Sequence, residues 1–229
     1  MNIFFFVLIA VIAYLLGSLS FSIIFTKLFM KEDIRRYGSG NAGMTNVLRT
    51  AGKLPAILTF AGDFAKAALS ILFVHLLIGK GQPILVELGC YLAGFFCLMG
   101  HVFPCYYGFK GGKGVLVSAT MILFIDWRIC LIVVAVFAAA TLLTRWVSLG
   151  SVLAAVTFPI ATWFMYREIT PTLADLSSSY AFVYTNQRLI VTIIALVFGL
   201  VVIIKHKDNI GRLLRGQERK ISFHKNKEA

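Results

Sequence analysis

Long apolar stretches separated by short polar segments run through the whole sequence. The first, residues 3–26, carries no charged side chain and exceeds the roughly 20 residues that a helix needs to cross a bilayer core. Six more follow, at about residues 55–79, 83–104, 114–126, 129–145, 147–166 and 188–205. This pattern predicts an all-α, polytopic membrane protein with about seven transmembrane helices. We expect one integral-membrane domain over residues 1–229, ending in a short basic tail at 206–229.

The stretch 114–126 differs from the others because it is too short to span a bilayer comfortably. Backbone polar groups cannot stay unpaired in hydrocarbon. We therefore expect neighbouring protein to surround this stretch, or the chain to enter it from a half-buried loop.

Composition and charge narrow the functional classes. Hydrophobic residues make up 59% of the 229 and charged residues 14%, which excludes a soluble domain. The net charge of +12 is explained mostly by basic loops on one side of the membrane and by a tail suited to anionic lipid headgroups. Nucleic-acid binding is not expected, because the tail after residue 211 is too short to form a basic binding module.

The distribution of Lys and Arg predicts the orientation, because cytoplasmic loops carry the excess of these residues. With the N-terminus outside and the C-terminus in the cytoplasm, the inside segments hold 17 of the 22 basic residues and the outside segments hold four. Lys66 lies within a span. We expect a multi-pass protein of the cell (plasma) membrane.

Three polar segments interrupt the apolar sequence: Gly38–Arg49, Gly100–Gly114 and Lys205–Arg212. They are rich in glycine, asparagine and basic residues and poor in acids. Such segments favour binding of an anion, of which phosphate is the commonest. The predicted orientation puts all three on the cytoplasmic face, where they can form one site.

Two nucleotide-binding motifs and the common metal motifs are excluded. Gly38–Gly43 matches the dinucleotide pattern, but no strand precedes it. Gly108–Gly114 resembles a phosphate-binding P-loop, yet its spacing is one residue short and no hydroxyl residue follows the lysine. The four cysteines form no C-x-x-C pair. We expect neither a metal ion nor a cofactor.

Taken together, the three segments resemble one known family. They read Ser39-Gly-Asn-x-Gly-x-Thr-Asn-x-x-Arg49, Gly-His101-x-Phe-Pro-(x)6-Gly-Gly-Lys113-Gly and His206-x-x-Asn209-Ile-x-Arg212-Leu. In this order among membrane spans, they resemble the bacterial acyl-phosphate:glycerol-3-phosphate acyltransferase family, PlsY. The resemblance covers essentially the whole chain. Lys205 and Gly211 are small departures, because an arginine and a lysine are usual there.

The resemblance implies an enzyme of phospholipid biosynthesis. It would transfer a fatty acyl group from acyl phosphate to the 1-hydroxyl of glycerol 3-phosphate, giving 1-acyl-glycerol 3-phosphate and phosphate. Its partners would be these two substrates and the bilayer, and an enzyme that produces acyl phosphate is a candidate partner. The His-x-x-x-x-Asp pair of other glycerolipid acyltransferases is absent. The alternative is a transporter of organic phosphates or other anions, although the two halves of the chain show no convincing similarity.

The resemblance and the side-chain chemistry together give a set of site residues. Arg49 offers a planar fork and Lys113 a mobile point charge for substrate phosphates. Ser39, Asn46 and Asn209 are candidates to orient the glycerol or to stabilise the oxyanion. The residues assigned to catalysis are Ser39, His206 and Asn209. Those assigned to substrate and phosphate binding are Asn41, Gly43, Thr45, Asn46, Arg49, Gly111, Gly112, Lys113 and Gly114.

The role of His206 is left open between a general base and a residue that positions substrate. A base is not required, because the phosphate of the donor can itself accept the proton of the attacking hydroxyl. His101 fits a structural role better than His206 does.

Asp63 and Lys66 lie three residues apart in the second span and therefore on one helix face. A charge in hydrocarbon is costly unless it is paired, so we expect an ion pair; a proton relay is the alternative.

Overall fold

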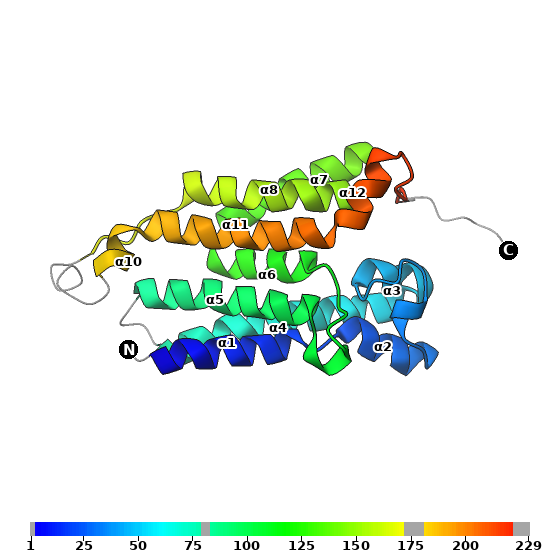
Figure 1. Cartoon of the computed structure of the whole chain (residues 1–229), viewed down its shortest axis with the longest axis horizontal. Helices are drawn as coiled ribbons and strands as arrows, with labels where there is room; N and C mark the ends of the chain where they lie inside the picture. Colours follow the sequence, from blue (N-terminus) through cyan, green and yellow to red (C-terminus); the bar gives the residue numbers. More distant parts are fainter. Residues whose placement is uncertain (1–2, 79–82, 172–180, 222–229) are drawn as a thin grey trace. The chain divides into compact units, whose positions relative to one another are not determined.

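Helices make up most of the part of the chain that the structure describes (Figure 1). This computed structural model describes residues 3–78, 83–171 and 181–221, and no strand occurs among them. Six predicted apolar stretches coincide with single helices to within about two residues at most ends. These are α4 (Lys53–Ile78), α5 (Pro83–Val102), α6 (Val115–Ile125), α7 (Trp127–Thr144), α8 (Val147–Met165) and α11 (Gln187–Lys205).

The first apolar stretch forms two helices. α1 (Ile3–Gly17) ends before Ser18, and α2 (Phe21–Met30) continues in the same stretch. The intervening residues are not helical, so the carbonyl oxygen of Leu19 lacks the partner that a continuous helix would provide. Lys66 of α4 supplies it, with its Nζ 2.8 Å from that oxygen. The break is thus compensated by a side chain that follows much later in the sequence.

Six helical segments within the described ranges are long and apolar enough to cross a membrane, counting the broken first stretch as one. The shorter α6 adds a seventh apolar helix. It contacts α4 and α5, which agrees with the expectation that neighbouring protein supports it. The number of true spans and their orientation stay predictions.

The chain divides into two compact units. The first comprises residues Met1–Trp127 and Ile169–Gln187, and the second comprises Arg128–Glu168 and Arg188–Ala229. The single domain expected from the sequence stays a prediction. Residues 222–229 of the predicted tail lie outside the described residues.

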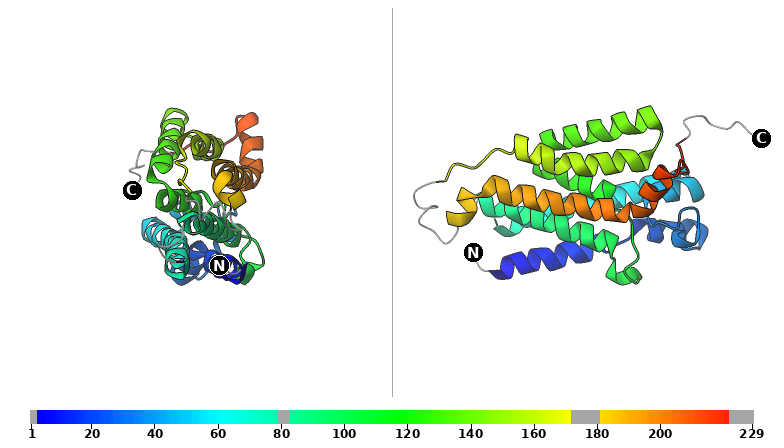
Figure 2. Two further views of the ribbon diagram at one scale, coloured as in Figure 1. Left: turned by 90° about the vertical axis from the view of Figure 1, so that its left-hand side faces the viewer. Right: turned by 45° about the horizontal axis from the view of Figure 1, so that its top comes forward.

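In the first unit, α1, α4 and α5 run alongside one another (Figure 2). Glycines allow the backbones of α1 and α5 to approach closely. A Cβ added to Gly17 would lie 2.2 Å from the carbonyl oxygen of Cys97, and one added to Gly100 would lie 2.2 Å from that of Tyr14. Small residues at such contacts are typical of membrane helices, because packing rather than water exclusion joins them.

The second unit is built by the same rule. A Cβ on Gly150 of α8 would lie 2.8 Å from the carbonyl oxygen of Phe137 in α7, and one on Gly199 of α11 would lie 2.5 Å from that of Ala155 in α8. The rings of Phe158 and Phe198 meet edge to face at 6.2 Å between centroids. These contacts join α7, α8 and α11.

The structure also contains short helices that the apolar pattern did not reveal. They are η1 (Ile34–Arg36), α3 (Met44–Thr50), η2 (Cys105–Tyr107), α10 (Ala181–Thr185) and α12 (Lys207–Leu214).

Candidate functional site

The first polar segment is a loop closed around one buried amide. Asn46, only 4% exposed, accepts a hydrogen bond at Oδ1 from the backbone N–H of Ser39 at 3.0 Å. Its Nδ2 donates to the carbonyls of Tyr37 and Asn41 at 3.0 and 3.1 Å. The side chain therefore holds the loop from inside. Contact of Asn46 with a substrate stays a prediction.

The glycines of this loop serve its shape. Gly38 and Gly40 have φ of +61° and +70°, a conformation that favours glycine. Gly43 is the residue that precedes α3, and its N–H donates to the carbonyl of Asn41 at 3.0 Å. Asn41 and Gly43 thus belong to the turn that leads into the helix.

The side chains predicted to meet substrate lie on the outer side of the loop and of α3. Ser39, Thr45 and Arg49 are all exposed. Arg49 is in the last turn of α3, and within the described part of the chain its guanidinium has no hydrogen-bonding partner. Its fork is therefore available to an anion.

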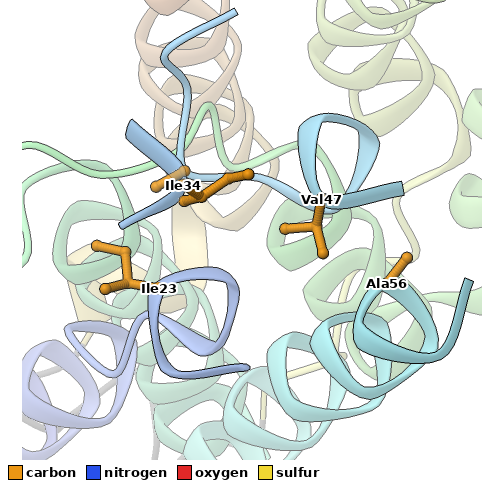
Figure 3. Packing of buried hydrophobic residues seen from close by; sticks show 5 residues of the cluster. Ile23, Ile34, Val47 and Ala56 are labelled. Atoms are coloured by element: carbon orange, nitrogen blue, oxygen red, sulfur yellow. The ribbon is translucent and has the colours of Figure 1, made fainter. Parts of the chain in front are cut away.

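An apolar cluster anchors this exposed segment to the helices below it. Ile23 of α2, Ile34 of η1, Val47 of α3 and Ala56 of α4 are each at most 2% exposed and pack together with Ala42 (Figure 3). The cluster joins both ends of the loop to α2 and α4. Arg49 is thus presented on a fixed support.

The second polar segment folds back onto the end of α5. The N–H of Gly111 donates to the carbonyl of Val102 at 3.2 Å, and that of Gly112 donates to the carbonyl of His101 at 3.1 Å. The residues between them, including η2, form a closed loop. Lys113 follows directly, and α6 begins after Gly114.

Close packing explains the glycines at the end of this loop. A Cβ on Gly111 would lie 2.0 Å from the carbonyl oxygen of His101, and one on Gly112 would lie 2.2 Å from His101 Nε2 and 2.6 Å from the carbonyl oxygen of Ala42. Gly114 has φ +80°. The N–H groups of Gly111 and Gly112 are bonded to carbonyls at the end of α5, and phosphate binding by these two glycines stays a prediction. Phosphate binding by Lys113 and Gly114 stays a prediction.

The two loops are tied together by a charged clamp. Arg35 donates from Nη1 to the carbonyls of Tyr107 and Lys110, at 2.7 and 3.2 Å. Its Nε and Nη2 bind the carboxylate of Asp33. The Arg35 guanidinium holds the pKa of Asp33 below its usual value through these hydrogen bonds. Arg35, which the sequence analysis used only for orientation, therefore joins the first two motifs within one unit.

The expected ion pair in the second span is confirmed. Asp63 Oδ1 and Lys66 Nζ are 2.8 Å apart, and their side chains are 3% and 1% exposed. Lys66 Nζ also lies 3.0 Å from Nδ1 of His101, the residue that borders the glycine loop. His101 is buried, in agreement with its predicted structural role.

The third motif lies in the second unit, at the junction of α11 and α12. His206 is 3% exposed, and its Nδ1 lies 2.8 Å from the carbonyl oxygen of Val202. A carbonyl only accepts, so Nδ1 carries the hydrogen and Nε2 is the basic nitrogen of the neutral ring. This tautomer is compatible with a base and with a positioning residue.

Glu218 is a residue that the sequence analysis missed. Its carboxylate accepts hydrogen bonds from Asn209 Nδ2 at 2.6 Å, Arg212 Nε at 2.7 Å and Ser148 Oγ at 2.9 Å. Burial opposes its ionisation, yet these donors outweigh burial and hold the pKa of Glu218 below its usual value. Glu218 is one of three acidic residues in the basic tail, with Asp208 and Glu228, so no sequence signal singled it out.

The structure thus brings the first and second motifs together in one unit and gives the third its own support in the other. Among the described residues, no group of three potential metal-ligating side chains occurs.

Comparisons with known proteins identify relatives along almost the entire chain. A family profile described as glycerol-3-phosphate acyltransferase matches residues 7–216. A curated protein of that name from Clostridioides difficile is 40% identical and covers 98% of this chain and 100% of its own. One from Bartonella henselae is 38% identical over 93% of this chain and 90% of its own.

Two solved structures are similar in fold and sequence. Both are crystal structures of PlsY (YgiH), an integral membrane glycerol 3-phosphate acyltransferase, and each is 29% identical to this chain over 95% of its length. The glycerol 3-phosphate form has a TM-score of 0.74 and is covered to 96%. The lysophosphatidic acid form has a TM-score of 0.72 and is covered to 95%.

Replacing Glu218 tests its supporting role. Because its pKa is lower in the folded protein, the carboxylate stabilises the fold above the usual glutamate pKa, and this contribution is lost as pH falls through the folded value. Glu218→Gln should lower stability at pH 7 by about 1.5–3 kcal/mol, the range for a hydrogen bond to a charged group. The difference from wild type should close as pH falls below the folded pKa of Glu218, which lies below its usual value.

The measurement is the thermal midpoint of the detergent-solubilised protein as a function of pH. Glu32→Gln is the matched control, because the Glu32 side chain is 42% exposed and pairs across the surface with Arg36 at 3.5 Å. Equal midpoints of Glu218→Gln and wild type at pH 7 would contradict the supporting role.

Proposed function

The chain belongs to the glycerol-3-phosphate acyltransferase family, and we propose that it transfers a fatty acyl group from acyl phosphate to the 1-hydroxyl of glycerol 3-phosphate. The products are 1-acyl-glycerol 3-phosphate and inorganic phosphate. The observation that carries this proposal is the match over residues 7–216, which contains all three polar motifs. The reaction is an acylation of phospholipid biosynthesis.

The geometry of the first unit supports binding of a phosphate-bearing substrate. Arg49 is exposed and has no hydrogen-bonding partner among the described residues, and the clamp of Arg35 holds its loop against the loop that carries Lys113. A planar fork and a mobile ammonium complement each other in holding phosphate oxygens. Both substrates of the proposed reaction carry such a group.

The site faces the cytoplasm in this proposal. The support is the excess of Lys and Arg in the loops that hold the three motifs, with the N-terminus outside and the C-terminus inside. A soluble glycerol 3-phosphate and a membrane-bound acyl phosphate can meet at that surface.

The chemistry is assigned to positioning and charge stabilisation. Acyl phosphate is a mixed anhydride with a good leaving group, and its phosphate accepts the proton of the attacking hydroxyl. Ser39 and Asn209 orient the glycerol or stabilise the oxyanion, and His206 positions substrate. A covalent acyl-enzyme is not required.

The reaction itself is tested with purified protein in detergent. Given a long-chain acyl phosphate and glycerol 3-phosphate, with a chelator and without ATP, it should form 1-acyl-glycerol 3-phosphate, identified by mass spectrometry. Acyl-CoA should be a poor donor, because its thioester brings no phosphate to the site. A transporter would form no lipid product under these conditions.

Arg49→Lys tests whether the planar guanidinium of Arg49 holds a substrate phosphate. The variant keeps the charge but loses bidentate geometry, so its catalytic efficiency should fall by at least about tenfold, the effect of losing one charge-assisted hydrogen bond. Arg36→Lys is the matched control, because Arg36 is 76% exposed in the same segment and should retain wild-type efficiency. Wild-type kcat/KM in Arg49→Lys would remove this residue from the phosphate site.

His206→Gln separates a positioning histidine from a base. Glutamine hydrogen-bonds but takes up no proton at neutral pH, so turnover should remain measurable if the donor phosphate accepts the proton. Loss of general-base catalysis costs typically about 100- to 10,000-fold. A fall of that size in kcat, at unchanged KM and with the fold verified, would overturn the substrate-assisted mechanism.

A further inference from the structure

A buried charge cluster lies beneath the glycine loop of the second motif. Asp63 and Lys66 of α4 form an ion pair at 2.8 Å, and both side chains are almost completely buried. Burying two charges is costly, and the cost is offset only when each charge has further hydrogen bonds. The remaining contacts of the ammonium group are therefore informative.

Lys66 makes polar contacts with three parts of the first unit. An ammonium group has three hydrogens and no acceptor. Besides Asp63, its Nζ lies 2.8 Å from the carbonyl oxygen of Leu19 and 3.0 Å from Nδ1 of His101. The first contact is at the break between α1 and α2, and the second is at the end of α5.

These contacts define the state of the His101 ring. Because the ammonium can only donate, Nδ1 of His101 accepts, and the neutral ring carries its hydrogen on Nε2. The distance of 3.7 Å from Nδ1 to the Asp63 carboxylate is too long for a hydrogen bond. His101 thus accepts a hydrogen bond from Lys66, which is itself paired with Asp63.

The other side of His101 meets the loop. Its carbonyl accepts the N–H of Gly112, and a Cβ on Gly112 would lie 2.2 Å from Nε2. The same Cβ would lie 2.6 Å from the carbonyl oxygen of Ala42, in the first motif. Gly112 is thus held between the His101 ring and the first loop, one residue before Lys113.

We propose that Asp63, Lys66 and His101 are positioning residues for the loop Gly111–Gly114, and that they set the place at which Lys113 meets a substrate phosphate. None of the three contacts substrate in this proposal. The inference rests on the proposed function, because it assigns Lys113 to phosphate binding. The ion pair thereby acts on catalysis at a distance, through His101.

The competing explanation is an ion pair that only stabilises the fold. A charge-balanced replacement distinguishes the two, because exchanging both partners of a buried pair for apolar residues is often neutral for stability, whereas removing one is strongly destabilising. Asp63→Leu/Lys66→Met removes the pair together with the contacts of Lys66 to His101 and to the Leu19 carbonyl. A stabilising pair would leave catalysis unchanged in this double variant.

The experiment measures the thermal midpoint, kcat and the KM for glycerol 3-phosphate in detergent. Asp63→Leu/Lys66→Met should stay folded and show a KM raised at least about tenfold, the effect of one displaced charged contact. Glu32→Gln/Arg36→Gln, which removes an exposed pair of the same unit, is the control and should match wild type. Wild-type KM and kcat in the buried-pair variant would overturn the proposal.

A second pair of variants keeps the test decisive if the double variant fails to fold. His101→Asn retains an acceptor in the place of Nδ1, whereas His101→Leu has a similar volume and no acceptor. The asparagine variant should recover most of the efficiency that the leucine variant loses. Equal efficiency of the two variants would refute the dependence on Lys66.

Coupling to Lys113 completes the test. If the cluster acts through Lys113, Lys113→Ala should raise KM markedly in wild type and much less in the cluster variant, because the effects of substitutions at coupled positions do not add. The cluster variant is Asp63→Leu/Lys66→Met, or His101→Leu if the double variant does not fold. Additive effects, or no effect of Lys113→Ala in wild type, would overturn the proposal. Absence of product from the wild-type protein would refute the proposed function instead.

Discussion

The requirement that every charge and backbone polar group be paired inside a membrane protein governs the first unit. Lys66 meets this requirement in three directions at once, toward Asp63, the Leu19 carbonyl and His101. If the first helix were continuous, one hydrogen of the Lys66 ammonium would have no acceptor. If residue 66 had a neutral side chain, the Leu19 carbonyl at the break would be unpaired. The break, the ion pair and the buried histidine are therefore parts of one solution.

Hydrogen bonds and close packing hold the loops of the first two motifs, although both loops are rich in glycine. Asn46 fills the first loop with hydrogen bonds, and Gly112 of the second is confined between His101 and Ala42. Arg35 then joins the loops through carbonyls of the second. Pre-organised charged groups bind an anion with less loss of conformational entropy. In the proposed function, these contacts hold the segments that carry Arg49 and Lys113 in defined positions.

The second unit uses a different device for its motif. The carboxylate of Glu218 draws Asn209 and Arg212 of α12 and Ser148 of α8 to one point. The composition of the third motif suggested that it binds an anion from outside the protein. In the structure, the Glu218 carboxylate of the protein itself holds the residues of this motif. Asn209, assigned to catalysis from the sequence, is held by this contact, and the same hydrogen bond determines where its amide points.

The sequence by itself determined the class of the protein, the positions of the long helices and the family. These follow from apolar length and from motif residues such as Arg49 and Lys113, which are local properties of the chain. The pairing of Asp63 with Lys66 was also predictable, because residues three apart share a helix face. Only the tertiary structure decided that Lys66 reaches Leu19 and His101, that Arg35 clamps the second loop, and that Gly111 and Gly112 serve close packing. Those contacts join residues up to 75 positions apart, and no local pattern encodes which distant carbonyl a side chain will meet.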